Sequence, residues 1–256
     1  MSYKYNEILT IPERCILDVR ITKVFFLKNF PLSAPEKKLL NNVILSMKWL
    51  ARINNTDSNI SQVKNKDYVY EEIQVMTCTI SSDNFERYND SCIQLFQKYI
   101  PYQTLFIIEN ESEFKINVCD KRVNQNDNSK RTIENYYSTT SLSKLYKNDL
   151  NSKFYESLSF NKLDKTNLET VYKGYIQAVI QYQASSITGS FNKRTQKRTE
   201  VDMENILELE ALEKDVASLI SQMKTEKQLN NKMSLNVKIQ KKRQEIDSIK
   251  NKLGQT

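Results

Sequence analysis

Histidine is absent from this chain of 256 residues, and glycine occurs only three times. Without histidine the chain lacks the commonest general base and the usual serine or cysteine triads. Gly174, Gly189 and Gly254 each stand alone, so neither of the glycine-rich loops that cradle phosphates is present. The familiar triad hydrolases and nucleotide-binding loops are therefore excluded.

Cysteine is also scarce, at four residues, and no two cysteines lie within four positions of each other. Zinc sites built on closely spaced Cys pairs or on Cys and His are excluded as local motifs. We expect Cys15, Cys78, Cys92 and Cys119 to be buried, reduced thiols. No metal-ligating set, cofactor site or small-molecule substrate site is predicted.

Long apolar runs are missing, since none approaches the roughly 20 residues needed to span a bilayer. The N-terminal stretch MSYKYNEILTIPER also lacks the apolar core of a secretory signal. We therefore expect a cytoplasmic protein without a membrane partner. The net charge of +7 and the pI near 9.0 suit an anionic partner such as DNA, and fit equally well a basic protein without one.

The most regular pattern lies in residues 203–253, which contain neither proline nor glycine. Two apolar seams at coiled-coil spacing occur in this stretch. The first seam is Leu209, Leu212, Val216, Leu219 and Met223, and the second is Leu235, Ile239, Lys242, Ile246, Ile249 and Leu253. Their registers differ by two residues, which is neither of the shifts that a continuous coiled coil absorbs easily. A turn near residues 227–231 explains the break, and the sequence predicts an antiparallel helical hairpin.

Charge supports this prediction, because residues 202–215 are mostly acidic and residues 238–252 mostly basic. Folding the chain near residue 228 brings the acidic segment beside the basic one. Each exposed ion pair contributes only about 0.2–1 kcal/mol, so charge sets orientation more than stability. The alternative is one straight helix of about 75 Å.

The first 150 residues predict a mixed α/β core domain. Residues 70–80, 104–109 and 114–119 read as strands, the first apolar on both faces and therefore central in its sheet. A helix is predicted between the first two strands, over residues 83–99. Another helix starts at Ser33 with a capping box, and its buried stripe runs to Met47. Residues 16–27 read as extended, and residues 120–131 as a loop.

Helices that pack on this domain are predicted over residues 151–184, followed by a basic linker over residues 185–201 and the hairpin over residues 202–254. The fold class is thus an α+β N-terminal domain, followed by helices and a C-terminal antiparallel coiled-coil hairpin.

Two basic clusters are candidate contacts for phosphate groups. The alternative is that both clusters are solvated loops without a ligand. The clusters are Lys121, Arg122, Lys130 and Arg131 in the first loop, and Lys193, Arg194, Lys197 and Arg198 in the linker. Glu113-Phe114-Lys115 also resembles the E-x-K motif of metal-dependent nucleases. Its preceding acid would have to be Glu109, across a tight turn, so an exposed hairpin with alternating charge is the preferred interpretation.

Several short segments carry a resemblance to a known family. They include Leu9-Thr10-Ile11-Pro12-Glu13-Arg14, Ile100-Pro101-Tyr102, Lys121-Arg122-Val123-Asn124-Gln125, Ser129-Lys130, Glu226-Lys227-Gln228-Leu229-Asn230 and Leu235-Asn236. Across nearly its whole length the chain resembles a bacterial family catalogued as a domain of unknown function. Members of that family tend to be encoded beside SNF2-type helicases and type III-like restriction-modification genes. The resemblance implies an accessory role in DNA handling or antiviral defence and supplies no active-site residues.

We therefore expect a non-enzymatic adaptor whose hairpin binds a helicase or methyltransferase subunit, or a second copy of the chain, with DNA contacts from the basic loops. The expected partner interface is the apolar seam: Leu209, Leu212, Val216, Leu219, Ile239, Ile246 and Ile249. A metal-dependent nuclease or other DNA-processing enzyme, and a coiled-coil oligomerisation protein without DNA contact, are the alternatives.

Overall fold

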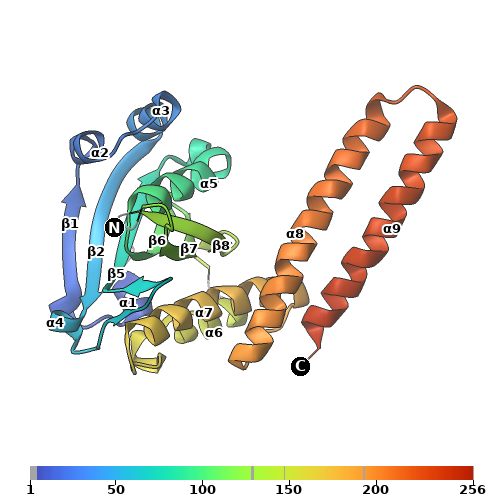
Figure 1. The fold of residues 1–256 in the computed structure, drawn as a ribbon. Helices are drawn as coiled ribbons and strands as arrows, with labels where there is room; N and C mark the ends of the chain where they lie inside the picture. The colour runs from blue at the N-terminus through green and yellow to red at the C-terminus, as the bar shows by residue number, and fades with distance from the viewer. Residues whose placement is uncertain (1–4, 128–129, 147, 193, 256) are drawn as a thin grey trace. The chain divides into compact units, whose positions relative to one another are not determined.

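The computed structural model describes residues 5–127, 130–146, 148–192 and 194–255 (Figure 1). The chain divides into two compact units, Met1–Val179 and Ile180–Thr256, and the division falls inside one long helix. Each unit has its own architecture. The first is built on a mixed sheet, and the second contains two long helices.

The sheet of the first unit has the strand order β1-β2-β5-β6-β7-β8, with β9 paired to β7. Its strands are β1 (Ile16–Ile21), β2 (Ile44–Asn54), β5 (Glu72–Ile80), β6 (Gln103–Glu109), β7 (Glu113–Val123), β8 (Arg131–Ser138) and β9 (Leu142–Ser143). Only β5 and β6 run parallel, joined by helix α5 (Ser82–Tyr99); the other pairs are antiparallel. The predicted strands, the helix between them and the central position of β5 are confirmed.

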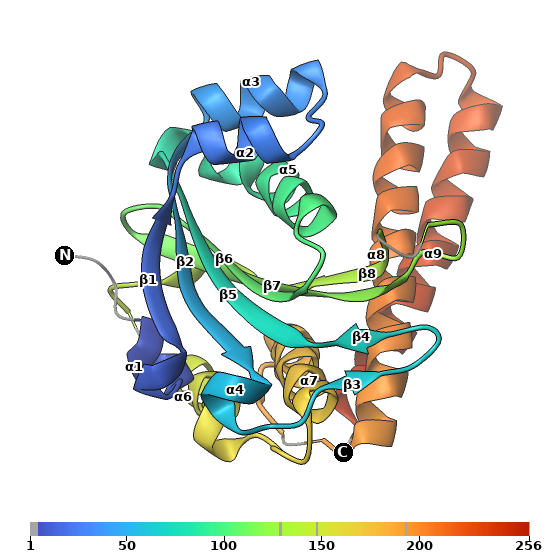
Figure 2. The same cartoon turned by 60° about the vertical axis from the view of Figure 1, so that its left-hand side comes forward.

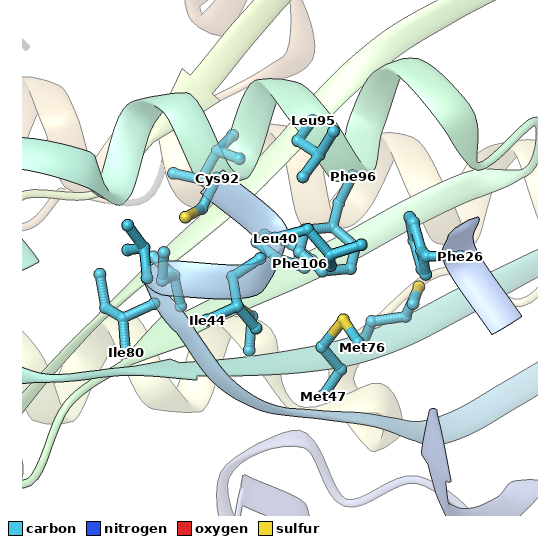
Figure 3. Close-up of a cluster of buried hydrophobic side chains, with 14 of the residues drawn as sticks. Phe26, Leu40, Ile44, Met47, Met76, Ile80, Cys92, Leu95, Phe96 and Phe106 are labelled. Atoms are coloured by element: carbon cyan, nitrogen blue, oxygen red, sulfur yellow. The ribbon is translucent and has the colours of Figure 1, made fainter. Parts of the chain in front are cut away.

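One face of this sheet is covered by α2 (Lys23–Asn29), α3 (Ala34–Asn42) and α5 (Figure 2). The buried cluster on this face includes Phe26 of α2, Leu40 of α3 and Phe96 of α5 over Met76 and Phe106 of the sheet (Figure 3). The Phe96 and Phe106 rings stack with centroids 4.6 Å apart. Aromatic pairs of this kind add to the free energy gained by burial, so the cluster fixes the three helices on the strands.

The opposite face is covered by α1 (Tyr5–Leu9), α6 (Asp149–Leu158) and the first half of α7 (Leu168–Thr188). Tyr5 and Tyr155 both contact the ring of Phe114 on β7. The buried Tyr172 hydroxyl donates to the Cys119 carbonyl oxygen at 2.9 Å. A small hairpin of β3 (Val63–Lys64) and β4 (Val69–Tyr70), the single turn α4 (Asn55–Ser58) and two 3-10 turns, Glu13–Cys15 and Phe160–Lys162, complete this unit.

The predicted helix from Ser33 to Met47 is too long, because α3 ends at Asn42 and β2 begins at Ile44. The capping box at Ser33 is present. A bulge in β2 between Ile44 and Ser46 explains the error. A bulge inserts one extra residue, so Ile44 and Met47 both reach the buried cluster although they are three positions apart. That spacing imitates one face of a helix.

Two other assignments also change. Of the segment read as extended over residues 16–27, only Ile16–Ile21 is a strand; Thr22 caps α2 by accepting a hydrogen bond from the Phe25 amide. The predicted loop over residues 120–131 is shorter, because β7 continues to Val123 and β8 starts at Arg131. Pairing between two long strands extends the sheet through a segment whose polar composition is typical of loops.

The second unit confirms the predicted helical hairpin. Helix α8 (Gln196–Thr225) and helix α9 (Leu229–Gly254) are joined by three residues, 226–228. Lys242 pairs with Asp215 at 2.7 Å and Lys250 with Glu213 at 3.6 Å, as the complementary charges predict. In the segment read as a basic linker, α7 extends to Thr188 and α8 begins at Gln196.

Candidate functional site

The apolar seam of the hairpin is largely covered by the chain itself. Five of its residues are no more than 8% exposed: Leu209, Leu212, Ile239, Ile246 and Ile249. Val216 and Leu219, nearer the turn, are half-buried. The expected partner interface on these residues therefore needs correction, because the five buried side chains hold the hairpin together and offer little free surface.

A cluster of three charged residues closes the base of the hairpin. Asp202 is fully buried, and its carboxylate accepts a hydrogen bond from Arg198 Nε at 3.0 Å and lies 3.6 Å from Arg194 Nε. Burial raises the pKa of Asp202, and the two guanidinium groups oppose that shift. A carboxylate in such a position stays charged only because cations lie beside it.

The same two arginines bind the C-terminal end of α9. Arg194 donates to the Leu253 carbonyl oxygen at 2.8 Å, and Arg198 donates to the Lys252 carbonyl oxygen at 2.6 Å. The last carbonyl groups of a helix lack partners within the helix and carry partial negative charge, so guanidinium groups stabilise them. Arg194 and Arg198 thus stabilise the end of α9, and the prediction that they contact DNA stays a prediction. In that cluster Lys197 is exposed, and Lys193 lies outside the described residues.

Lys121, from the other predicted basic cluster, is fully buried. Its ammonium group donates to the carbonyl oxygens of Ile100 and Tyr102, each at 2.8 Å. Burial lowers its pKa to about 8. This position corrects the prediction that Lys121 contacts phosphate, because strand alternation directs its side chain towards the end of α5 and away from solvent.

The other members of that cluster lie nearer the surface. Arg122 pairs with Glu134 at 2.9 Å, and the exposed Lys130 pairs with Asp127 at 3.0 Å. Arg131 is half-buried at the start of β8. Within this first cluster, Lys121 is buried while Lys130 is exposed, so its four cations do not form one continuous surface.

A stripe of apolar side chains faces outward from the first half of α9. Leu229, Met233 and Val237 are 71%, 61% and 56% exposed. Residues four apart on a helix advance by about 40°, so the three share one face, roughly opposite the buried Ile239 and Ile246. We call these three residues the outward stripe. The sequence analysis missed it, although their spacing of four, outside both seams, is a readable signal.

Comparison with known protein families shows which family the chain belongs to. A family model described as "Domain of unknown function (DUF4391)" matches residues 9–246. The chain belongs to the DUF4391 family. Neither the curated proteins nor the solved structures include a significant match to it.

In this DUF4391 chain the residues of the nuclease-like motif do not converge. Glu109 accepts a hydrogen bond from Tyr5 on α1 at 2.6 Å, whereas Lys115 donates to Asn89 on α5 at 3.1 Å. Helices α1 and α5 cover opposite faces of the sheet. Phe114 pairs with Glu109 and packs against Tyr5, which places Glu109 on the face that α1 covers. Glu109 and Lys115 therefore lie on opposite faces of the sheet, so this acid and this lysine do not face a common site.

Two further features concern the part of the DUF4391 chain that the structure describes. No group of three or more Cys, Asp or Glu side chains is placed to hold a metal ion. No described helix is both long enough and apolar enough to cross a membrane.

Proposed function

We propose that this DUF4391 chain is a non-enzymatic accessory subunit that binds a partner protein through the outward stripe. The observation that carries the proposal is the exposure of Leu229, Met233 and Val237, which ranges from 56% to 71%. Large apolar side chains clustered on one exposed helix face are a common signature of protein interaction sites. Their spacing also matches the anchors of a helix that lies in an apolar groove of its partner.

The internal contacts of the hairpin support this proposal. The buried seam and the Arg194–Asp202–Arg198 cluster hold the two helices together, whereas the stripe residues are mostly exposed. Removing the outward apolar groups should therefore leave the fold intact. Burying such a side chain fully against a partner contributes up to about 1.5–3 kcal/mol, so the three together would supply a substantial part of the binding free energy.

The resemblance to a family encoded beside SNF2-type helicases and type III-like restriction-modification genes suggests the setting. We propose a cytoplasmic DNA-handling complex, with a role in antiviral defence, in which the partner is a helicase or methyltransferase subunit. Lys197 and Lys130, both exposed, would contact DNA phosphates in that complex, with Lys130 exchanging its surface ion pair to Asp127 for a phosphate. Such contacts would be sensitive to salt and blind to base sequence.

Affinity purification from the native host tests the proposal. The bait proteins are the wild type, a Leu229→Ser/Met233→Ser/Val237→Ser variant, and a Gln240→Ala/Gln244→Ala control on the same outward face of α9. We expect one partner to be recovered with the wild type and the control, and its yield with the stripe variant to fall at least about tenfold. Equal recovery with the stripe variant would overturn the proposal.

The mass of the purified chain, measured by light scattering, distinguishes a second copy from a different partner. A dimer that the stripe substitutions convert to a monomer would make the chain its own partner. A wild-type monomer, combined with partner recovery in the purification, supports the accessory subunit.

A further inference from the structure

A groove of about 830 Å³ lies in the first unit, between α3, α5 and the edge strand β8. Figure 2 shows α3 and α5 on the same side of the sheet, of which β8 is a strand. The volume falls in the range of about 300–1,000 Å³ that is typical of ligand sites. Lys38, Lys98 and Tyr136 are among its lining residues and are exposed, so the groove is open to solvent.

Strand β8 supplies the floor of the groove through an irregular register. Tyr136 pairs with Cys119, and Ile133 pairs with Lys121. The two paired positions are therefore three residues apart on β8 but only two residues apart on β7. The bulge brings Ile133 and Tyr136 to the same face of the sheet, the face that α5 covers. Without it, strand alternation would direct one of the two away from the groove.

The lining is positively charged. Lys38, Lys98 and Arg131 contribute cations, and Glu36 is the single acid among the lining residues. Glu36 is already occupied: it accepts from Lys98 at 2.8 Å, from Tyr99 at 2.9 Å and from the Ser33 amide at 2.7 Å. Burial acts to raise the pKa of Glu36, but these hydrogen bonds outweigh it and lower the pKa to about 2. Glu36 therefore stays ionised and offsets one cation, and the three cations against this one acid leave the groove with an excess of positive charge.

Aromatic and amide side chains lie among these cations. Tyr88 projects from α5 and Tyr136 from β8, and Tyr136 is 40% exposed. Asn42, Asn84 and Gln94 line the same groove. Cations along a groove with interspersed aromatic rings are the usual means of holding single-stranded nucleic acid, since phosphates bind the cations and bases stack on the rings. Amide side chains can donate to and accept from base edges.

We propose that this groove binds single-stranded nucleic acid, with phosphates on Lys38 and Arg131 and a base stacked against Tyr136. An acidic peptide would bind the cations but would not stack on the ring of Tyr136. The dependence of binding on Tyr136 therefore distinguishes nucleic acid from an acidic peptide. The proposal is independent of the outward stripe, which lies in the second unit. Substitutions in the groove leave the stripe unchanged.

The test is fluorescence anisotropy with the full chain and a labelled oligothymidylate of about twelve nucleotides, in about 50–200 mM salt. Lys38→Gln has a close control in Lys37→Gln, because both lysines are exposed on α3 and only Lys38 lines the groove. We expect Lys38→Gln to weaken binding and to reduce the slope of log K against log salt by about 0.7. Lys37→Gln should leave both unchanged, and an equal effect of the two substitutions would overturn the proposal.

Stacking is tested with Tyr136→Ala, with Tyr102→Ala as the control at similar exposure, 36% against 40%. We expect Tyr136→Ala to weaken binding by about tenfold and Tyr102→Ala by less than about twofold. An abasic oligonucleotide of the same length should bind the wild type about tenfold more weakly and show no further loss with Tyr136→Ala.

Polyglutamate of matched charge completes the test as a competitor. Displacement of the oligonucleotide by polyglutamate as effectively as by unlabelled oligothymidylate, with no effect of Tyr136→Ala, would assign the groove to acidic protein segments and overturn the proposal. Circular dichroism melts confirm that each variant is folded.

Discussion

The ammonium group of Lys121 donates hydrogen bonds to the carbonyl oxygens of Ile100 and Tyr102, and the residue has no exposure to solvent. Both acceptors are neutral, so the charge is satisfied by hydrogen bonds alone at those two contacts. Burial lowers the pKa of this lysine to about 8, from an ordinary value of 10.5. The position links the end of α5 to β7, and this link, rather than a surface contact, accounts for the lysine in the fold.

Stability should therefore depend on pH through Lys121. Between about pH 8 and 10.5 the unfolded chain binds more protons at this residue than the folded chain, so its contribution to the free energy of unfolding rises with pH. The charged form is penalised fully below that window. From about pH 7 to pH 9.5 we expect the wild type to gain roughly 2 kcal/mol relative to Lys121→Met.

Urea denaturation of both proteins across that range measures the difference. Taking the difference cancels the cysteines and tyrosines that titrate in both chains. A difference that does not change with pH would contradict the assignment of a lowered pKa to Lys121.

The arginine pair at the base of the hairpin, Arg194 and Arg198, leads to a prediction about the stability of variants. Arg194→Ala combined with Arg198→Ala leaves the fully buried Asp202 without either guanidinium, at a cost of about 3–5 kcal/mol. Adding Asp202→Ala should recover part of that loss, because the uncompensated charge is then gone. Amide hydrogen exchange in the last turns of α9 reports the local opening free energy.

Lys197→Ala is the matched control for the arginine pair, since Lys197 belongs to the same predicted basic cluster in the linker and is exposed. It should change the opening free energy by less than about 0.5 kcal/mol. Equal effects of Lys197→Ala and the arginine substitutions would contradict a structural role for the pair.

At the scale of elements, the two faces of α9 differ in what they stabilise. Ile246 is 8% exposed in the seam, whereas Val237 is 56% exposed on the outward stripe. Ile246→Ala should lower the stability of the hairpin by about 2 kcal/mol or more, because it removes buried methyl groups and leaves a cavity. Val237→Ala should cost less than about 0.5 kcal/mol.

Thermal unfolding followed by circular dichroism compares the two variants. If Val237→Ala proves as destabilising as Ile246→Ala, the outward stripe is part of the fold and is not a free docking surface.

The elements also show which features of the fold could be predicted from the sequence. The register break and the opposed charges predicted the hairpin, because both are local and periodic. The end of α3 was misplaced because a bulge in β2 gives Ile44 and Met47 the spacing of a helix. Arg194 and Arg198 could not be assigned from sequence, since their partners at Leu253 and Lys252 lie more than fifty positions away.

The groove was beyond sequence reasoning for a similar reason. Its lining residues come from α3, α5 and β8, and the pairing of β8 with β7 depends on a register shift. Nothing local in the sequence indicates that Lys38 and Arg131 line one groove. The outward stripe, in contrast, has a local signature, the spacing of four between Leu229, Met233 and Val237, but it lies outside the registers of both seams.

At the scale of the whole molecule, each unit presents a surface of its own. The first unit carries an open, positively charged groove, and the second a helical hairpin with apolar groups facing outward. Neither surface requires a catalytic residue. An accessory subunit with one surface for a partner protein and another for nucleic acid is consistent with both units.

Photo-crosslinking in the native host tests the docking surface most directly. A photoreactive amino acid replaces Met233 on the outward stripe or, as the control, Gln244 on the polar half of the same face. The account predicts a cross-linked product at position 233 that contains a different protein, absent or at least about tenfold weaker at position 244. Equal products at the two positions, or a product at position 233 made only of this chain, would contradict it.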